Sequence, residues 1–271
     1  MTDPVPHDPA MTDRAILAGS AYRTERDLAA RQSLYRWQTP SYDLPALVAE
    51  QLHSVRGSVA DIGCGNGKFI KRLMRDRPDL RLLGLDVSPG ILDGVPRPVA
   101  VADAARLPLR TASLGAALAL HMLYHVENIP AAGAELGRVL TEPGIVVAST
   151  NSERDKAELD QLWVQAAGDV LGVEKGPSRI SLSARFSLEK APDMLGAVFS
   201  KVETIPLLGT IAVTTPDPVI AHMASYRAWA SQHEVPFDET IARAHTIVTD
   251  HIARHGAFTI TCLGGILVCS R

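Results

Sequence analysis

Residues 59–68 read Val-Ala-Asp-Ile-Gly-Cys-Gly-Asn-Gly-Lys. An apolar run that leads into alternating glycines is typical of a buried β-strand ending in a sharp turn. Glycine supplies the backbone angles of such a turn and lets a ligand lie against bare main chain. Residues 69–74 continue with helical spacing, so the predicted unit is a strand, a glycine loop and a helix. Open α/β sheets bind nucleotide-like ligands at this kind of turn.

The spacing of the glycines distinguishes between possible ligands. A dinucleotide-binding loop reads Gly-x-Gly-x-x-Gly, whereas Gly63, Gly65 and Gly67 alternate here and Asp61 stands two residues before the first. A carboxylate at the strand tip would repel a pyrophosphate, but it suits a ligand with an ammonium group. The stretch resembles motif I of the class I S-adenosylmethionine-dependent methyltransferases, Asp/Glu-x-Gly-x-Gly-x-Gly. The resemblance implies a cofactor with an amino-acid tail, a sulfonium and an adenosine.

Two later aspartates extend the resemblance. Residues 81–88 read as a second strand ending in Asp86, 21 residues after Gly65. A carboxylate there can accept both ribose hydroxyls, and it matches the family's motif II. Residues 99–103 read as a third short strand ending in Asp103, which matches the family aspartate that accepts the adenine amino group. A single aspartate at a strand end is more often a turn or cap residue, so the assignment depends on all three acids in order.

The resemblance covers roughly residues 56–150. Residues 114–126 look like the family's fourth strand and the turn after it, and residues 145–150 look like its fifth strand. The acid that the family often carries near the start of strand four is missing, because residues 110–115 contain none. The resemblance implies an α/β, Rossmann-like class I methyltransferase fold, with a seven-stranded, mostly parallel sheet and helices on both of its faces.

We expect one structural domain with four parts. Residues 1–12 are predicted to be a disordered tail, and residues 13–55 to be an N-terminal helical lid over the cofactor. Residues 56–150 would form the cofactor-binding core, and residues 151–271 the rest of the core together with a cap.

The cap is predicted as an insertion at about residues 207–256, before the last strand. Residues 200–207 and 209–214 read as two strands, and residues 217–233 and 237–255 read as two helices. An insertion of about fifty residues is long for a simple connection. We therefore expect it to cover the acceptor pocket.

The resemblance assigns the cofactor contacts residue by residue. The methionine end would be held by the strand tip and the loop, the ribose by the second acid and its neighbour, and the adenine by the third. These residues are Asp61, Gly63, Cys64, Gly65 and Gly67, then Asp86 and Val87, then Asp103 and Ala104, with His121 beside the sulfonium.

Methyl transfer from a sulfonium is an in-line displacement, so the protein mainly has to hold the acceptor in line. Such positioning can contribute up to about 7–11 kcal/mol in favourable systems. A base is needed only if the acceptor must lose a proton, and histidine suits that task near neutral pH. His121 directly follows strand four, and His125 lies four residues on. Both are candidate catalytic residues; the alternative for His125 is that it caps or packs the following helix.

Aromatic residues are the candidates for the acceptor pocket. His222, Tyr226, Trp229 and His233 follow offsets of 0, 4, 7 and 11, which is one stripe of a single helix. The stripe is either a face that packs on the core or an aromatic wall for a flat acceptor. The other candidates are Tyr35 and Trp37 from the lid and Tyr124 from the turn after strand four. For each of these the alternative is packing on the core.

Composition limits the function classes. The chain has 271 residues, a net charge of -3 and no dense basic run, whereas proteins that grip long nucleic acids usually carry a basic face. The three cysteines lack metal-ligand spacing, and their sparse, odd number suits a reducing cytoplasm. No apolar stretch reaches about 18 residues, and residues 1–10 do not resemble a signal peptide. We therefore expect no metal, no membrane span and no nucleic-acid partner; the oligomeric state stays open.

The sequence predicts a cytoplasmic S-adenosylmethionine-dependent methyltransferase that acts on a small molecule, such as a specialised metabolite. Two alternatives remain at this point. One is an RNA methyltransferase of the same fold, and the other is a non-catalytic S-adenosylmethionine binder.

Overall fold

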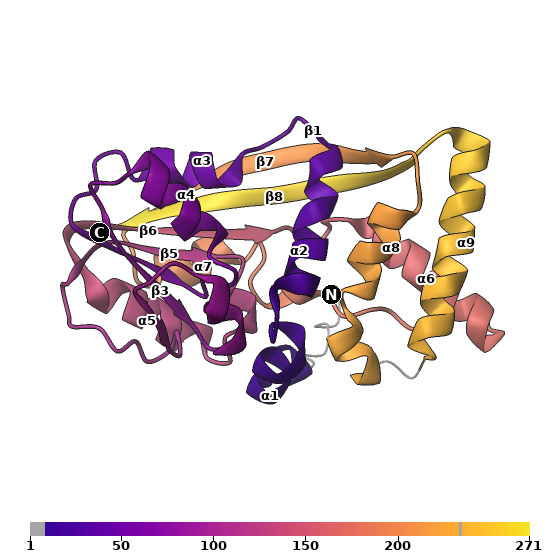
Figure 1. The fold of residues 1–271 in the computed structure, drawn as a ribbon, viewed down its shortest axis with the longest axis horizontal. Helices are drawn as coiled ribbons and strands as arrows, with labels where there is room; N and C mark the ends of the chain where they lie inside the picture. The colour runs from indigo at the N-terminus through magenta and orange to yellow at the C-terminus, as the bar shows by residue number, and fades with distance from the viewer. Residues whose placement is uncertain (1–8, 233–234) are drawn as a thin grey trace.

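The computed structural model describes residues 9–232 and 235–271 (Figure 1). Most of the expected tail, residues 1–8, and His233 of the aromatic stripe lie outside these residues. Residues 9–12 differ from the expected tail, because Pro9–Met11 forms a 3₁₀ turn in which Ala10 and Met11 are buried. Ala10 and Met11 are buried because they pack against Leu17 and Trp229.

The centre of the molecule is one sheet of eight strands in the order β1-β7-β8-β6-β5-β2-β3-β4. Its parallel part comprises β2 (Ser58–Ile62), β3 (Arg81–Asp86), β4 (Val99–Val101), β5 (Leu114–Leu120) and β6 (Leu140–Asn151). β8 (Phe258–Ser270) runs antiparallel to both β6 and β7 (Lys201–Val213). The two-residue β1 (Gln38–Thr39) adds one edge strand to the predicted seven.

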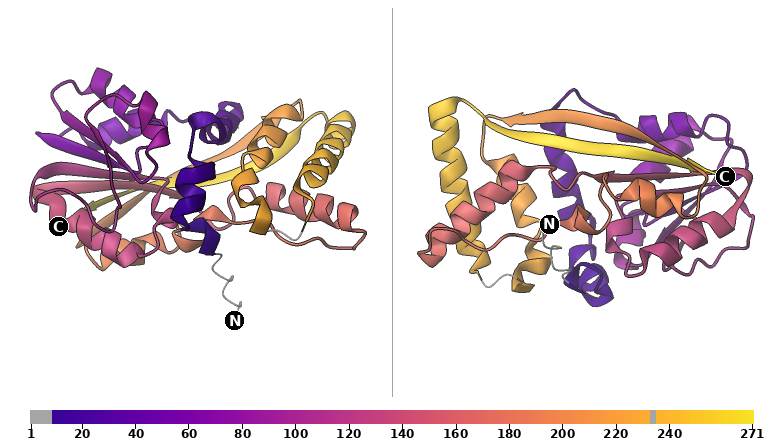
Figure 2. Two further views of the ribbon diagram at one scale, coloured as in Figure 1. Left: turned by 60° about the horizontal axis from the view of Figure 1, so that its bottom comes forward. Right: turned by 180° about the vertical axis from the view of Figure 1, so that it is seen from behind.

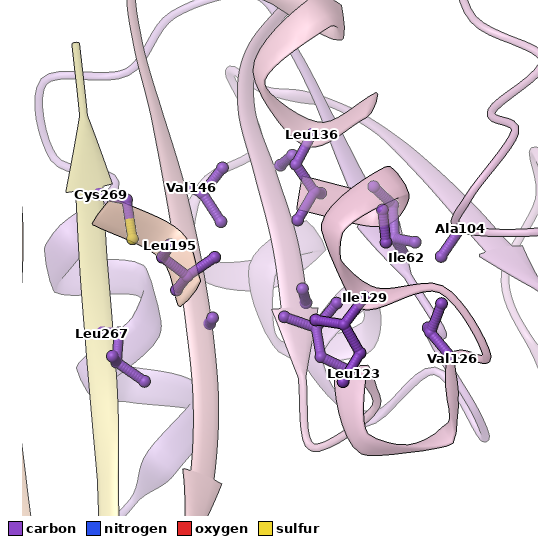
Figure 3. Close-up of a cluster of buried hydrophobic side chains, with 14 of the residues drawn as sticks. Ile62, Ala104, Leu123, Val126, Ile129, Leu136, Val146, Leu195, Leu267 and Cys269 are labelled. Carbon is purple, nitrogen blue, oxygen red and sulfur yellow. The ribbon is translucent and has the colours of Figure 1, made fainter. Parts of the chain in front are cut away.

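Two layers of helices bury the faces of the parallel part. β5 reads Leu-Gly-Ala-Ala-Leu-Ala-Leu, a continuous apolar run of the kind found where both faces of a strand are covered. α5 (Ile129–Val139) and α7 (Ala191–Gly196) pack on one face, where Ile62, Val146 and Leu267 meet Leu136 and Leu195 (Figure 3). α3 (Leu44–Gln51) and α4 (Lys68–Asp76) cover the other face.

β7 is longer than either of the two strands predicted in this region. The two expected strands at residues 200–207 and 209–214 are one strand, paired with β8 from Lys201 to Val213. Gly209 does not interrupt it. A Cβ at Gly209 would lie 2.6 Å from Nε2 of Gln38, so this glycine makes room for the edge strand β1.

A second hydrophobic core lies against the part of the β7–β8 pair that contains Ile211 and Ile260. Ile211 and Ile260 pack there with Trp163 of α6 (Ala157–Leu171), Val219 of α8 (Asp217–Ala224) and Phe237 of α9 (Phe237–His255). Figure 1 shows these helices gathered at the end of the β7–β8 pair that is remote from α3 and α4. The cap thus consists of α8 and α9, which follow β7, together with α6, which precedes β7 and was predicted to belong to the rest of the core.

The predicted helix over residues 217–233 is broken. α8 ends at Ala224, and a separate 3₁₀ turn follows at Arg227–Gln232. A continuing helix would have the Trp229 N–H donate to the Ser225 carbonyl. That carbonyl instead accepts Nη1 of Arg31 at 2.9 Å, and the Trp229 N–H donates to Tyr226.

The N-terminal segment lies between the sheet core and the cap, as the left view of Figure 2 shows. It consists of α1 (Arg14–Ile16), a π-helical turn at Leu17–Ala21, α2 (Glu25–Ser33) and a 3₁₀ turn at Leu34–Trp37. The Asp13 and Thr24 side chains cap α1 and α2. None of the helices within the described residues is both long and apolar enough to cross a bilayer.

Candidate active site

A cavity of about 390 Å³ opens where the carboxyl ends of β2, β3 and β5 meet, and it continues between the N-terminal segment and the cap. Its size lies in the range of small-molecule sites, about 300–1,000 Å³. Its walls come from the glycine loop, the strand ends, the lid and the cap helices. In a parallel sheet of this kind, ligands bind at the carboxyl edge where the strand order reverses.

The glycine loop needs glycine at its alternating positions. Gly63, Gly65 and Gly67 have φ values of 69°, 52° and 70°, which L side chains rarely adopt. A Cβ at Gly63 would lie 2.7 Å from Cβ of Met122, and one at Gly67 would lie 2.7 Å from a methyl of Val95. Gly63, Cys64 and Gly65 line the cavity, whereas Gly67 turns the chain into α4 and does not.

Asp86 joins the tips of two strands. Its Oδ2 accepts the Gly65 N–H at 2.9 Å, and its Oδ1 accepts the Ser88 N–H at 2.9 Å. Each carboxylate oxygen has further lone pairs, and both Asp86 and Val87 line the cavity. Burial raises the pKa of Asp86, although the N–H donors of Ser88 and Gly65 oppose the shift.

Asp61 is buried behind the loop and is not part of the cavity wall. The residue is 2% exposed, and neither carboxyl oxygen has a hydrogen-bond partner among the described residues. Burial, together with the charge of Asp86, raises the pKa of Asp61 to about 8. Buried polar groups are almost always paired. An unpartnered carboxyl beside the loop therefore fits a ligand that brings an ammonium group.

Asp103 is bound to the lid. Its Oδ1 accepts the Ala105 N–H at 2.9 Å, and its Oδ2 forms an ion pair with Arg14 of α1. Asp103, Ala104 and Arg14 all line the cavity. Asp103 therefore lies at the cavity and binds the N-terminal segment through Arg14.

His121 stands at the end of β5 in a left-handed conformation with φ of 53°. Its backbone N–H donates to the Ser149 carbonyl at 3.0 Å, and the residue lines the cavity. Strained backbone of this kind is often found at functional sites. Burial, with a further contribution from the nearby charge of Lys156, lowers the pKa of His121 to about 4. Its imidazole is therefore neutral near pH 7.

His125 binds the N-terminal segment through both of its ring nitrogens. Its Nδ1 lies 3.0 Å from the Met11 carbonyl oxygen, and its Nε2 lies 2.7 Å from the Tyr22 hydroxyl. A carbonyl only accepts, so Nδ1 carries the hydrogen and Nε2 accepts from Tyr22. The ring also stacks on Trp229 with its centroid 6.1 Å away. Both nitrogens are thus engaged by the N-terminal segment and not by the following helix, and the residue also lines the cavity. That His125 acts as a catalytic base stays a prediction.

The predicted aromatic residues separate into two groups. Tyr35, Tyr124, His222 and Tyr226 line the cavity. Trp229 does not, because it is fully buried and its Nε1 donates to the Ala10 carbonyl at 3.2 Å. Trp37 is 42% exposed and lies outside the cavity. The single stripe fails because α8 ends before Tyr226.

Lys156 was missed by the sequence analysis. It precedes α6 with φ of 58° and is buried in the cavity wall. Its Nζ lies 2.5 Å from Oδ2 of Asp155 and donates to the Tyr35 hydroxyl at 2.7 Å. The other oxygen of Asp155 accepts the Leu263 N–H at 2.8 Å. Nothing in the polar run at residues 151–156 signals a buried lysine with a left-handed backbone.

Arg31, Arg179 and Tyr22 were also missed, although all three line the cavity. They occur in stretches where charged residues are common, so no local signal distinguishes them from surface residues. Within residues 9–232 and 235–271, no group of three His, Cys, Asp or Glu side chains is placed to hold a metal ion.

A pH-dependent stability is expected from His125. Burial lowers its pKa to about 4, against 6.5 in an unfolded chain. The unfolded state therefore binds more protons between these values, and stability falls as the pH drops below 6.5. The loss at pH 5 should be roughly 1–2 kcal/mol. Urea unfolding of the wild type and of His125→Gln at pH 7.5 and 5.0 measures it.

The comparison with His125→Gln is needed because burial shifts the pKa of Asp61 upward, which changes stability in the opposite sense. The variant should lose less stability than the wild type between the two pH values. Equal losses would contradict the buried, neutral state of His125.

Comparison with known proteins agrees with this geometry. Residues 60–148 match the family model described as a methyltransferase domain. The chain is 33% identical over 112 residues to a malonyl-[acyl-carrier protein] O-methyltransferase of Hahella chejuensis. The aligned region covers 39% of this chain and 40% of that protein. It is 32% identical over 143 residues to the Serratia marcescens protein of the same name, covering 48% and 55%. The chain thus spans about half the length of the curated relatives that it matches.

Solved structures show the same fold. A protein designated a methyltransferase of an antibiotic biosynthesis pathway in Anabaena variabilis has a TM-score of 0.62 at 14% identity, covering 84% of this chain and 96% of that one. An S-adenosylmethionine-dependent methyltransferase of Thermotoga maritima has a TM-score of 0.51 at 16% identity, covering 96% and 100%. Residues 60–148 therefore match a methyltransferase domain, and the chain has the fold of these methyltransferases of solved structure. The predicted resemblance and the predicted fold are confirmed.

Proposed function

We propose that this protein is an S-adenosylmethionine-dependent methyltransferase that acts on a small-molecule acceptor. One observation carries the proposal: the glycine loop, Asp86 and the neutral His121 all face a single cavity that continues beneath the cap. The proposed cofactor site and the proposed acceptor site would thus share one cavity.

The residues of the cofactor half fit S-adenosylmethionine. When bound, this cofactor supplies a methyl group on a positively charged sulfur. Gly63 and Gly65 offer bare main chain to the methionine end, and the unpartnered Asp61 stands behind them. Asp86 has lone pairs left for the ribose hydroxyls, and Asp103 with Ala104 would meet the adenine.

The acceptor half supports a small molecule. Residues of the N-terminal segment and of the cap helices line it, and its walls include Tyr35, Tyr124, His222 and Tyr226. An RNA strand would need an open basic groove, whereas the chain has a net charge of -3. His121 lines the same cavity and is neutral, so a ring nitrogen can accept a hydrogen bond from an acceptor hydroxyl or amine. Its lowered pKa makes it a weak base, which suits an acceptor that has no proton to lose.

The curated relatives do not identify the acceptor. Their names specify methylation at oxygen of a malonyl-acyl-carrier protein, but the match covers only 40% and 55% of their length. We propose oxygen as the first methylated atom to test in this chain.

The experiment uses the purified full chain and S-adenosylmethionine labelled in its methyl group. Separate reactions contain a small-metabolite extract, mixed ribosomal and transfer RNA, or an acyl-carrier protein loaded with a malonyl group. We expect label in the small-molecule fraction and none on the RNA. Label on RNA alone would overturn the small-molecule proposal. Calorimetry that detects no heat with S-adenosylhomocysteine would overturn the cofactor assignment as well.

A further inference from the structure

Arg31 places a buried positive charge in the cap half of the cavity. The residue lies on α2, is 8% exposed and lines the cavity. Its Nη1 donates to the Ser225 carbonyl at 2.9 Å. Its Nη2 is buried without a hydrogen-bond partner. Among residues 9–232 and 235–271, no Asp or Glu forms an ion pair with it.

The neighbouring buried cations are neutralised, in contrast to Arg31. Lys156 lies 2.5 Å from Asp155, and Arg179 lies 2.5 Å from Asp160. The two histidines close by add no charge, because burial lowers the pKa of both His125 and His222. A buried charge without a counter-charge is costly. The ligand-free protein therefore holds an excess positive charge at one point of the acceptor half.

Aromatic rings hold the guanidinium of Arg31 in place. Its Cζ lies 5.1 Å from the ring centre of Tyr22, 5.6 Å from that of Tyr226 and 5.9 Å from that of Trp229. Such contacts favour a cation but bring no full negative charge. They also give the site apolar walls beside the guanidinium. This arrangement suits a ligand that joins an apolar body to an anionic group.

The orientation of α2 indicates which ligand Arg31 meets. Leu28 and Gln32 of this helix face the glycine loop: a Cβ at Gly65 would lie 3.0 Å from a methyl of Leu28, and Gln32 lies 3.5 Å from the Asn66 amide. Arg31 instead donates to Ser225, in the cap. Its guanidinium therefore faces the acceptor half, away from the loop expected to hold the cofactor's methionine end.

We propose that the methyl acceptor carries a carboxylate, and that Arg31 binds it between the rings of Tyr22 and Tyr226. This inference rests on the proposed function, because it names the substrate class of the same cavity. A guanidinium presents parallel N–H donors that match the two oxygens of a carboxylate. Arg31 is thus a specificity-determining residue, and an uncharged analogue of the acceptor should leave it unpaired.

The test measures binding to the full chain saturated with S-adenosylhomocysteine. The probes are three pairs of an acid and its amide: phenylacetate and phenylacetamide, 4-hydroxybenzoate and 4-hydroxybenzamide, hexanoate and hexanamide. In the wild type we expect at least one acid to bind tenfold or more tightly than its amide. Arg31→Met should abolish that preference. Arg26→Met should keep it, because Arg26 lies on the same helix with its side chain 85% exposed.

Two results would overturn the proposal. One is a wild type that prefers no acid over its amide, and the other is a preference that survives in Arg31→Met. Should Arg31→Met fail to fold, as judged by circular dichroism, Arg31→Lys replaces it. That variant keeps the charge but loses the planar fork, so its preference should be reduced without being lost.

A further arm separates the acceptor from the cofactor as the source of the carboxylate. S-Adenosylhomocysteine carries a methionine-type carboxylate, whereas 5′-methylthioadenosine does not. We expect Arg31→Met to bind both as the wild type does. A variant that loses affinity for S-adenosylhomocysteine alone would assign Arg31 to the cofactor and refute the inference. Absence of S-adenosylhomocysteine binding in the wild type would instead refute the proposed function.

Discussion

Replacing Asp86 with alanine is expected to weaken the binding of S-adenosylhomocysteine by well over tenfold. The carboxylate would bind two ribose hydroxyls, and hydrogen bonds to a charged group are worth about 1.5–3 kcal/mol each. A loss of about 1.4 kcal/mol already corresponds to tenfold in affinity. The substitution also releases the Gly65 N–H, which Asp86 holds at 2.9 Å. Isothermal titration calorimetry measures the effect.

Two variants control for this experiment. Asp86→Asn keeps one carbonyl oxygen and should lose less affinity than Asp86→Ala. Asp79→Ala removes a surface aspartate that pairs with Arg77 at 2.6 Å, and it should bind as the wild type does. Near-native affinity of a folded Asp86→Ala would contradict the ribose assignment.

Replacing Lys156 with methionine is expected to lower the free energy of unfolding by about 3–5 kcal/mol, the usual cost of removing one partner of a buried ion pair. Both side chains of the Lys156–Asp155 pair are only 5% exposed. The substitution leaves Asp155 as an uncompensated buried carboxylate and removes the donor to the Tyr35 hydroxyl. Urea unfolding at pH 7.5 measures the loss.

The control variants separate the charge effect from packing. In the double variant Asp155→Asn/Lys156→Met, neither of the two positions carries a charge. The side-chain amide oxygen at position 155 can still accept the Leu263 N–H. This double variant should recover much of the stability. Arg243→Met breaks a half-exposed pair with Asp169 and should cost less than about 1 kcal/mol. A loss in Lys156→Met no larger than in Arg243→Met would contradict the burial of this pair.

The cofactor half was predictable because its signals are local in the chain. The apolar strand at residues 58–62, the positive-φ glycines and the helix after them form one continuous unit. Asp86 ends β3 and Asp103 lies two residues after the end of β4. Parallel pairing of these strands brings their ends to the same edge. Neighbouring residues therefore specify both the conformation and the place of each group.

The acceptor half was predictable only in part, because its residues come from distant segments. α8 ends at Ala224, and the Ser225 carbonyl after it accepts from the Arg31 guanidinium, a contact across 194 positions. His125 loses its free nitrogens to Met11 and Tyr22, more than a hundred positions away. Periodicity within one segment cannot reveal which partner arrives from another.

The order of glycines and aspartates along the chain was thus enough to establish the fold and the kind of cofactor. The backbone conformations and the charge states of the residues in the acceptor half depend on how the N-terminal segment packs against the cap. The left-handed Lys156 and the unpaired Arg31 are ordinary residues in the sequence, and they acquire their chemistry only when other segments remove water around them. Burial changes the cost of a charge, and burial is a property of the assembled fold.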